Sequence, residues 1–306
     1  GRTDVLASEI RARLDKRRDA DEVVARSESG PVAVATRSDV ATDVEVPSAP
    51  FLGSRVVTDI DLDRIYPYIN TVALFRGQWQ FKKGARSDTE YQHLLEDTVH
   101  PIFERMKIAC RDWLRPAVVY GFYPCASDGN DLVIFDPDGA TEIERFSFPR
   151  QQGRRNLCIS DFFRPIDENE RDVVGFHCVT MGSRVSEIAH ERFEANDYAE
   201  YLYIHGMGVE CAEALAELWH RRIRQELGID GDDAPTVRQL FSQKYRGSRY
   251  SFGYPACPEM QDQDTLFRLL EPERIGCTLT ENWQIDPEQS TSAIIVHHPE
   301  AKYFNV

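Results

Sequence analysis

Residues 245–259 combine residue types that could hold an organic anion; they read Tyr-Arg-Gly-Ser-Arg-Tyr-Ser-Phe-Gly-Tyr-Pro-Ala-Cys-Pro-Glu. Glycines and prolines among the aromatic residues favour an irregular backbone, whose amide groups are not all used by a helix or a sheet. Arg249 offers a planar pair of donors for a carboxylate, and the tyrosines offer flat faces and hydroxyls for a purine or a ribose. On residue types alone, a ligand-binding loop and a structured core loop remain equally good interpretations.

Three other motifs suggest ligand sites but fit structural roles better. Residues 205–211, His-Gly-Met-Gly-Val-Glu-Cys, lack the third glycine of a dinucleotide loop and lie within a helical period, which favours a close-packed helix. Residues 136–139, Asp-Pro-Asp-Gly, lack the further acidic ligands of a calcium loop and predict a hairpin turn. His297 and His298 follow a predicted strand, and because adjacent residues there point to opposite faces, we expect structural or surface histidines.

No hydrolase site is indicated by the sequence. His177 and Cys178 are adjacent on a predicted strand, so their side chains point to opposite faces and do not suit a catalytic dyad. The chain also contains no Gly-x-Ser-x-Gly motif. Residues 150–155, Arg-Gln-Gln-Gly-Arg-Arg, form a local basic cluster in an acidic chain. This cluster is either a solvated turn or an electrostatic docking patch.

The elements that must position these residues predict an α+β fold. Apolar periodicity indicates two long helices, over residues 89–113 and 197–227, with Gly228 as the C-cap of the second. Short turns separate the strands, which implies antiparallel pairing, and no regular βαβ alternation is present. The predicted strands are 117–123, 132–135, 141–148, 173–181 and 293–296, and the predicted short helices are 236–244 and 264–270.

Composition restricts the classes of partner and compartment. The chain has 306 residues and a formal net charge of −15, which argues against nucleic acid or an anionic membrane as its main partner. The seven cysteines are scattered and never form Cys-x-x-Cys, so we expect reduced thiols in a cytoplasmic protein. No apolar run has membrane length, and charge from Arg2 onward does not suit a signal peptide.

The first 50 residues differ from the rest because they contain no aromatic residue. We expect a charged helix over residues 5–26 and an extended linker over 27–50, followed by the folded domain at 51–306. A disordered N-terminal tail is the alternative interpretation of this leader.

Residues 249–255 match the pattern R-x-x-x-G-Y-P, and with Ala-Cys-Pro-Glu after them the chain resembles the S-adenosylmethionine-binding activation domain of cobalamin-dependent methionine synthase. The likeness extends in order from about residue 55 to the C-terminus. The resemblance implies a single curved domain with a twisted antiparallel sheet flanked by long helices. The leader would then be the tail of a preceding cobalamin-binding domain with its linker. Further matching segments are 68–70, 150–152, 156–162, 212–217, 279–281 and 298–304.

The same resemblance implies roles for eight residues. Arg249 would bind the carboxylate of S-adenosylmethionine, the backbone around Ser251 would contact the adenosyl part, and Tyr254 would lie against the ligand and cobalamin. Asn70 stands where the family pattern has an aspartate that accepts from the ligand's amino group, so part of a charge-assisted hydrogen bond is lost. The remaining implied contact positions are Glu213, Gly253, Tyr303 and Phe304.

The implied activity is reactivation of methionine synthase, a methyltransferase of methionine biosynthesis. S-adenosylmethionine would supply a methyl group, and a flavodoxin-like or other flavoprotein reductase an electron, to restore methylcobalamin from cob(II)alamin. The chain lacks a D-x-H-x-x-G pattern, so cobalamin would come from another domain and the fragment alone would not be catalytic. The alternative is a docking module for the cobalamin domain and the reductase, with weak or lost S-adenosylmethionine binding. A free-standing methyltransferase would need an activating base in the pocket, and we find no such constellation.

Overall fold

The fold is an antiparallel sheet covered on both faces. The computed structural model describes residues 37–152 and 155–306, and within them a seven-stranded sheet has the order β4-β3-β2-β5-β9-β6, with β1 paired to β2. A separate two-stranded ribbon joins β7 to β8. The predicted α+β class and antiparallel pairing are confirmed. The strands are β1 (Gly53–Val57), β2 (Ala117–Asp128), β3 (Asp131–Phe135), β4 (Glu142–Ser147), β5 (Asp172–Thr180), β6 (Ser248–Tyr250), β7 (Thr278–Leu279), β8 (Ile285–Asp286) and β9 (Ser290–Val296).

Strand β2 organises the sheet because it changes partner along its length. Its first half pairs with β1, its second half pairs with β3, and its other edge pairs with β5. Alternate side chains of β2 enter two different cores, Val118 and Tyr120 on one face and Val119 and Tyr123 on the other. Burial on both faces therefore explains the nearly continuous apolar runs of the central strands.

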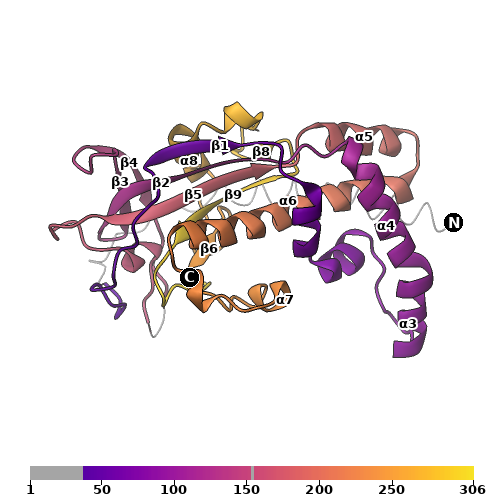
Figure 1. Ribbon diagram of the computed structural model, residues 1–306, viewed down its shortest axis with the longest axis horizontal. Helices are drawn as coiled ribbons and strands as arrows, with labels where there is room; N and C mark the ends of the chain where they lie inside the picture. Colours follow the sequence, from indigo (N-terminus) through magenta and orange to yellow (C-terminus); the bar gives the residue numbers. More distant parts are fainter. Residues whose placement is uncertain (1–36, 153–154) are drawn as a thin grey trace.

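Helix α6 (Tyr198–Glu226) lies along one face of the sheet, and α8 (Asp262–Leu270) covers the other (Figure 1). The Asp197 side chain caps the start of α6, and Gly228 follows its end with a φ of +67°, so the predicted helix and cap are confirmed. The predicted helix 89–113 is also confirmed, as α3 (Asp88–Leu94), a π-helical turn (Leu95–Val99), α4 (His100–Ala109) and a 3₁₀ turn (Cys110–Asp112).

The remaining helices are short, and several of them were not predicted. A π-helical segment packs against α6, and α5 pairs with α6 at the end of the molecule where α3 and α4 lie (Figure 1). These elements are α2 (Leu62–Ile65), α5 (Arg184–Glu194), α7 (Val237–Leu240), the π-helical segment Ala73–Gln78, and the 3₁₀ turns Tyr66–Tyr68, Ile159–Phe162, Asp230–Asp232 and Pro272–Ile275.

The structural interpretations of the glycine-rich and histidine motifs are confirmed. Residues 205–211 lie inside α6, and residues 136–139 form the turn between β3 and β4. His297 is buried, with Nε2 at 2.6 Å from Asp172 Oδ1, and His298 Nε2 lies 3.0 Å from the Ala41 carbonyl oxygen. No group of three or more His, Cys, Asp or Glu side chains in the described part of the chain could hold a metal ion.

The first described residues, which belong to the predicted extended linker 27–50, are docked on the domain. Arg37 donates hydrogen bonds to Ser127 Oγ at 2.6 Å and to the carbonyl oxygens of Asp161 at 2.8 Å and Phe163 at 2.7 Å. Val40 is buried in the core, so packing begins well before Phe51. Residues 37–50 contain no helix or strand, and the predicted helix 5–26 lies outside the described residues.

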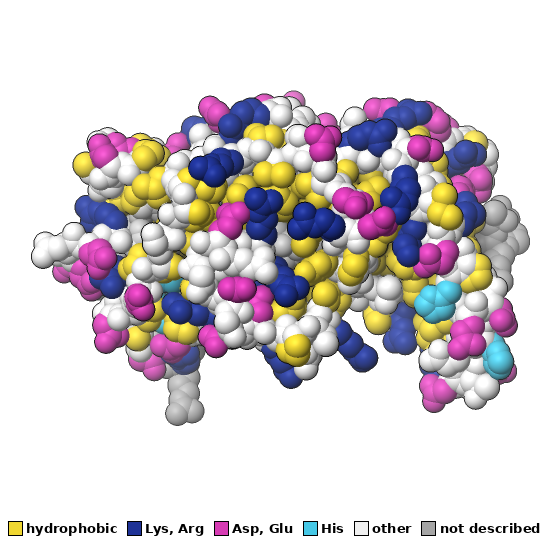
Figure 2. All heavy atoms as spheres, viewed as in Figure 1, with side chains coloured by type: hydrophobic (Ala, Val, Ile, Leu, Met, Phe, Trp, Pro, Cys, Tyr) yellow, Lys and Arg dark blue, Asp and Glu magenta, His cyan; other side chains and the backbone are white. Residues whose placement is uncertain are grey.

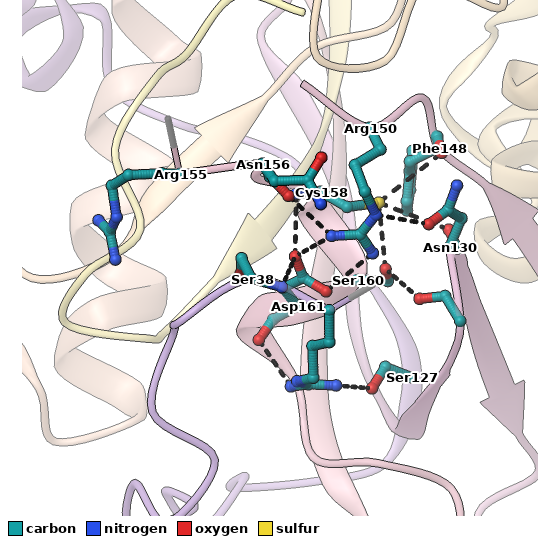
Figure 3. Close-up of polar contacts among 12 residues, drawn as sticks. Ser38, Ser127, Asn130, Phe148, Arg150, Arg155, Asn156, Cys158, Ser160 and Asp161 are labelled. Atoms are coloured by element: carbon teal, nitrogen blue, oxygen red, sulfur yellow. Dashed lines mark hydrogen bonds and ion pairs between the residues drawn. The ribbon is translucent and has the colours of Figure 1, made fainter. Parts of the chain in front are cut away.

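The two described arginines of the basic cluster at 150–155, Arg150 and Arg155, are both engaged in ion pairs within the domain. Arg150 forms a buried ion pair with Asp161, whose side chain is fully buried, and Figure 3 shows this pair at the centre of a polar network. Arg155 lies nearer the surface and pairs with Asp39 and Glu300. The guanidinium of Arg150 therefore neutralises a carboxylate that burial would otherwise leave without compensation.

The surface carries both signs of charge. On the face in Figure 2, acidic and basic side chains are interspersed with hydrophobic ones, and no uniformly basic surface is seen there. Among the helices of the described residues, none combines the length and apolar character that crossing a bilayer requires.

Candidate functional site

A cleft of about 910 Å³ lies between α6, the segment after β6, and the β7–β8 ribbon. It is lined by six of the predicted site residues together with residues that the sequence analysis did not single out. The six predicted residues are Asn70, Glu213, Arg249, Ser251, Tyr254 and Tyr303. The fold thus brings together side chains from positions as far apart as 70 and 303. Their separation in the sequence does not indicate which of them become neighbours.

Arg249 is the only cationic side chain among the cleft's described lining residues. It sits at the centre of β6, where its backbone pairs with Ile295 of β9. Its Nη2 donates a hydrogen bond to Glu213 Oε2 at 3.1 Å, and its Nε lies 3.6 Å from Glu217 Oε2. Burial opposes the charged form of Arg249, but the two carboxylates outweigh it and raise its pKa, so the guanidinium is charged at neutral pH.

The loop after β6 turns tightly at Gly253, whose φ is +84°. A Cβ atom at this position would lie 2.7 Å from Met260 Sδ, so both the backbone conformation and the space favour glycine. The Gly253 N–H donates to the Cys257 carbonyl at 3.0 Å, and the Cys257 N–H donates to the Tyr254 carbonyl at 2.9 Å. This closed turn presents the side chain of Tyr254, which is 57% exposed, at the cleft.

Among the other predicted residues, Asn70 and Tyr303 line the cleft, whereas Gly253 and Phe304 do not. Asn70 lines the cleft, but its Oδ1 also accepts a hydrogen bond from the Ala73 N–H at 3.2 Å, at the start of the π-helical segment. Tyr303 lines the cleft, and 41% of the residue is exposed. Phe304 is buried against Phe162 and does not line the cleft, and Gly253 shapes the loop without lining it.

Acidic and amide side chains line the cleft beyond the predicted residues. Glu217 lies one helical turn after Glu213 on α6 and is buried, and burial raises the pKa of its carboxyl against the opposing effect of Arg249. The spacing of four residues from Glu213 is the signal that could have identified Glu217 in the sequence. The other such side chains are Gln243, Gln263, Gln284, Asp286 and Glu288.

The charge in the cleft favours a ligand that carries cationic groups. Four carboxylic acids line it, at positions 213, 217, 286 and 288, against the single guanidinium of Arg249. An amino acid-like end with one carboxylate and one ammonium group, on a molecule with a further positive charge, would match this arrangement. The described lining residues contain no histidine or lysine that could serve as a general base.

Comparison with known proteins points to one family. The model for the vitamin B12 dependent methionine synthase activation domain matches residues 61–306. Methionine synthases of Mycobacterium tuberculosis and Mycobacterium leprae are 44% and 43% identical to the chain over 301 residues, which covers 90% of this chain and 24% of each relative. The chain therefore spans about a quarter of the length of these curated relatives.

A solved structure gives the same assignment at the level of the fold. The crystal structure of a MetH reactivation domain bound to AdoHcy matches with a TM-score of 0.79 and 26% sequence identity, over 90% of both chains. The family match covers the whole cleft, including its first lining residue at position 70 and its last at position 303. The chain belongs to the activation domain family of vitamin B12-dependent methionine synthases.

Proposed function

We propose that this chain binds S-adenosylmethionine as the methyl donor for reductive remethylation of cob(II)alamin in a longer methionine synthase. Cobalamin would be carried by another domain of the same polypeptide, and a flavodoxin-like or other flavoprotein reductase would supply the electron. The observation that carries the proposal is Arg249, a single charged guanidinium set among carboxylates in a cleft of about 910 Å³. This volume suits a ligand of drug-like size.

The residues of the cleft fit S-adenosylmethionine group by group. Arg249 can bind its carboxylate, and the surrounding acids can balance its ammonium and sulfonium charges. The partly exposed rings of Tyr254 and Tyr303 offer faces for the adenosyl part. Ser251 lines the cleft between Arg249 and Tyr254 along the chain, which is consistent with its implied adenosyl contact.

The role of the protein here is to position the ligand. Bound S-adenosylmethionine supplies a methyl group on a sulfonium, which is already an activated leaving group, so this chain needs no base. Its residues would fix both ends of the ligand and leave the methyl group open to the cobalamin of the neighbouring domain. The exposure of Tyr254 at the cleft is consistent with a site that a second domain must reach.

A docking module with weak or lost S-adenosylmethionine binding is the second candidate. Asn70 favours it, because its side-chain oxygen already accepts a hydrogen bond from Ala73 and carries no charge for a ligand's ammonium group. A surface used only for docking gives no reason to keep Arg249 between two glutamates in a cleft.

Calorimetric titration of S-adenosylmethionine tests the proposal. We expect saturable binding to the wild type and a loss of about 10- to 150-fold in affinity for Arg249→Ala, since a charged hydrogen-bond partner contributes about 1.5–3 kcal/mol. Arg184→Ala is the matched control, because it removes an equal charge from an exposed site on α5 and should leave binding unchanged. Absence of saturable binding to the wild type at millimolar ligand would reject the proposal and favour the docking module.

A further inference from the structure

Glu217 is a buried acid that the family resemblance did not assign. It lies on α6 one turn after Glu213, and only 6% of its surface is exposed. Its Oε2 faces Arg249 Nε at 3.6 Å, which is an ion-pair distance longer than a hydrogen bond. Its Oε1 is buried and has no hydrogen-bond partner among the residues that the structure describes. Arg249, the one ion-pair partner of Glu217 among the described residues, is therefore the group that compensates this buried carboxylate most directly.

The two glutamates contact different parts of the Arg249 guanidinium. Glu217 faces Nε, and Glu213 accepts a hydrogen bond from Nη2. Within residues 37–152 and 155–306, no hydrogen bond from Nη1 is present. Glu213 is half exposed whereas Glu217 is buried, so Glu217 is the more fixed of the two contacts. The two glutamates therefore engage Nε and Nη2 and leave the Nη1 donor of the fork without a contact to either acid.

We propose that Glu217 is a positioning residue that holds the Nε edge of Arg249, so that the guanidinium presents its Nη1 side to the carboxylate of S-adenosylmethionine. This inference rests on the proposed function and adds a residue to it. An arginine side chain has several rotatable bonds, and fixing it before the ligand arrives reduces the entropy lost on binding. Glu217 acts through Arg249 and does not itself need to touch the ligand.

The test uses Glu217→Gln, which removes the charge and keeps the shape of the side chain. S-adenosylhomocysteine is titrated at pH 8, because it has the same amino acid end as S-adenosylmethionine without the sulfonium charge. We expect binding to weaken about 10-fold, in the range of a charged contact. Binding of 5′-methylthioadenosine, which lacks the amino acid end, should not change. Glu210→Gln is the matched control, because Glu210 is also a buried acid of α6 but contacts Gln78 and does not line the cleft.

A double-mutant cycle distinguishes positioning from direct contact. If Glu217 acts through Arg249, Glu217→Gln should cause no further loss of S-adenosylhomocysteine affinity in the Arg249→Ala background. An equal loss in both backgrounds, or no loss in the wild-type background, would overturn the inference. A wild type that binds neither S-adenosylmethionine nor S-adenosylhomocysteine would instead reject the proposed function.

A second variant covers the case in which Glu217→Gln does not fold. Glu217→Asp keeps the charge but withdraws the carboxylate by one methylene group from Arg249. We expect Glu217→Asp to weaken the binding of S-adenosylhomocysteine and to leave the binding of 5′-methylthioadenosine unchanged. Equal weakening of both ligands would show a general disturbance of the cleft and would contradict positioning through Arg249.

Discussion

Asn70 shows how one side chain can have two roles. It lines the cleft, and its Oδ1 also caps the π-helical segment by accepting from the Ala73 N–H at 3.2 Å. A carboxylate can accept the same hydrogen bond, and negative charge is favourable at the start of a helical segment. The Asn70 amide is therefore sufficient for this hydrogen bond to the Ala73 N–H, and the absence of a carboxylate charge affects only ligand binding.

Asn70→Asp should strengthen S-adenosylmethionine binding. A charge-assisted hydrogen bond to the ligand's ammonium group is expected to add about 1 kcal/mol, or about 5-fold in affinity. Calorimetry on the variant and the wild type measures this difference. Binding of 5′-methylthioadenosine, which has no ammonium group, is the control and should be unchanged. Equal affinity of variant and wild type for S-adenosylmethionine would mean that position 70 does not contact the ammonium group.

At the scale of elements, α6 depends on glycines for its close contacts. A Cβ atom at Gly206 would lie 2.6 Å from Gln78 Cβ and 3.0 Å from Trp79 Cδ1, so the π-helical region approaches α6 directly at this point. The Trp79 indole N–H also donates to the Tyr203 carbonyl oxygen at 3.2 Å. Close packing therefore explains a glycine in a helix interior, where propensity alone would disfavour it.

Gly206→Ala should lower the free energy of unfolding despite the better helix propensity of alanine. Overpacking is expected to cost about 1–3 kcal/mol, because Gln78 and Trp79 would have to move. Denaturant unfolding measures this change. Gly77→Ala is the matched control, since nothing lies within 4 Å of a Cβ atom built there. An unchanged or higher stability for Gly206→Ala would show that α6 can move away from the π-helical segment at little cost.

At the scale of the whole molecule, residues 37–41 pack against a part of the domain that is distant in sequence and adjoins the cleft. Arg37 binds the carbonyl oxygens on either side of Phe162, and Phe162 packs against Tyr250 and Phe304. Tyr250 and Phe304 are neighbours in sequence of Arg249 and Tyr303. The docked segment therefore supports, through Phe162, the backbone from which two cleft residues project.

Arg37→Ala should loosen this segment and destabilise the domain. Loss of its hydrogen bonds to partly buried acceptors is expected to cost about 1.5–3 kcal/mol, measured as the free energy of unfolding. Limited proteolysis near residues 37–41 should become faster. Arg155→Ala is the control in the same region, and because its ion pairs are partly exposed it should cost at most about 1 kcal/mol. Equal effects of the two substitutions would contradict a specific anchoring role for Arg37.

Much of the architecture could be predicted because it rests on local patterns. Apolar periodicity identified both long helices, and turn residues such as those at 136–139 identified the antiparallel hairpins. The short elements were missed for physical reasons. Strand β6 has only three residues and is defined by its pairing with β9, and α5 carries many charged residues around a narrow apolar face.

The sequence by itself determined the fold class and the order of the main elements, because these follow from periodicity and turn chemistry, and the contiguous motif at 249–255 indicated one part of the cleft. Only the tertiary structure decided which acids meet Arg249, since Glu213 and Glu217 approach it through the packing of α6 beside an edge strand. It also decided that Phe304 lies in the core while Tyr303 faces the cleft, and that residues 37–41 are docked. Such contacts join residues far apart in the chain, and their geometry depends on packing that no local pattern encodes.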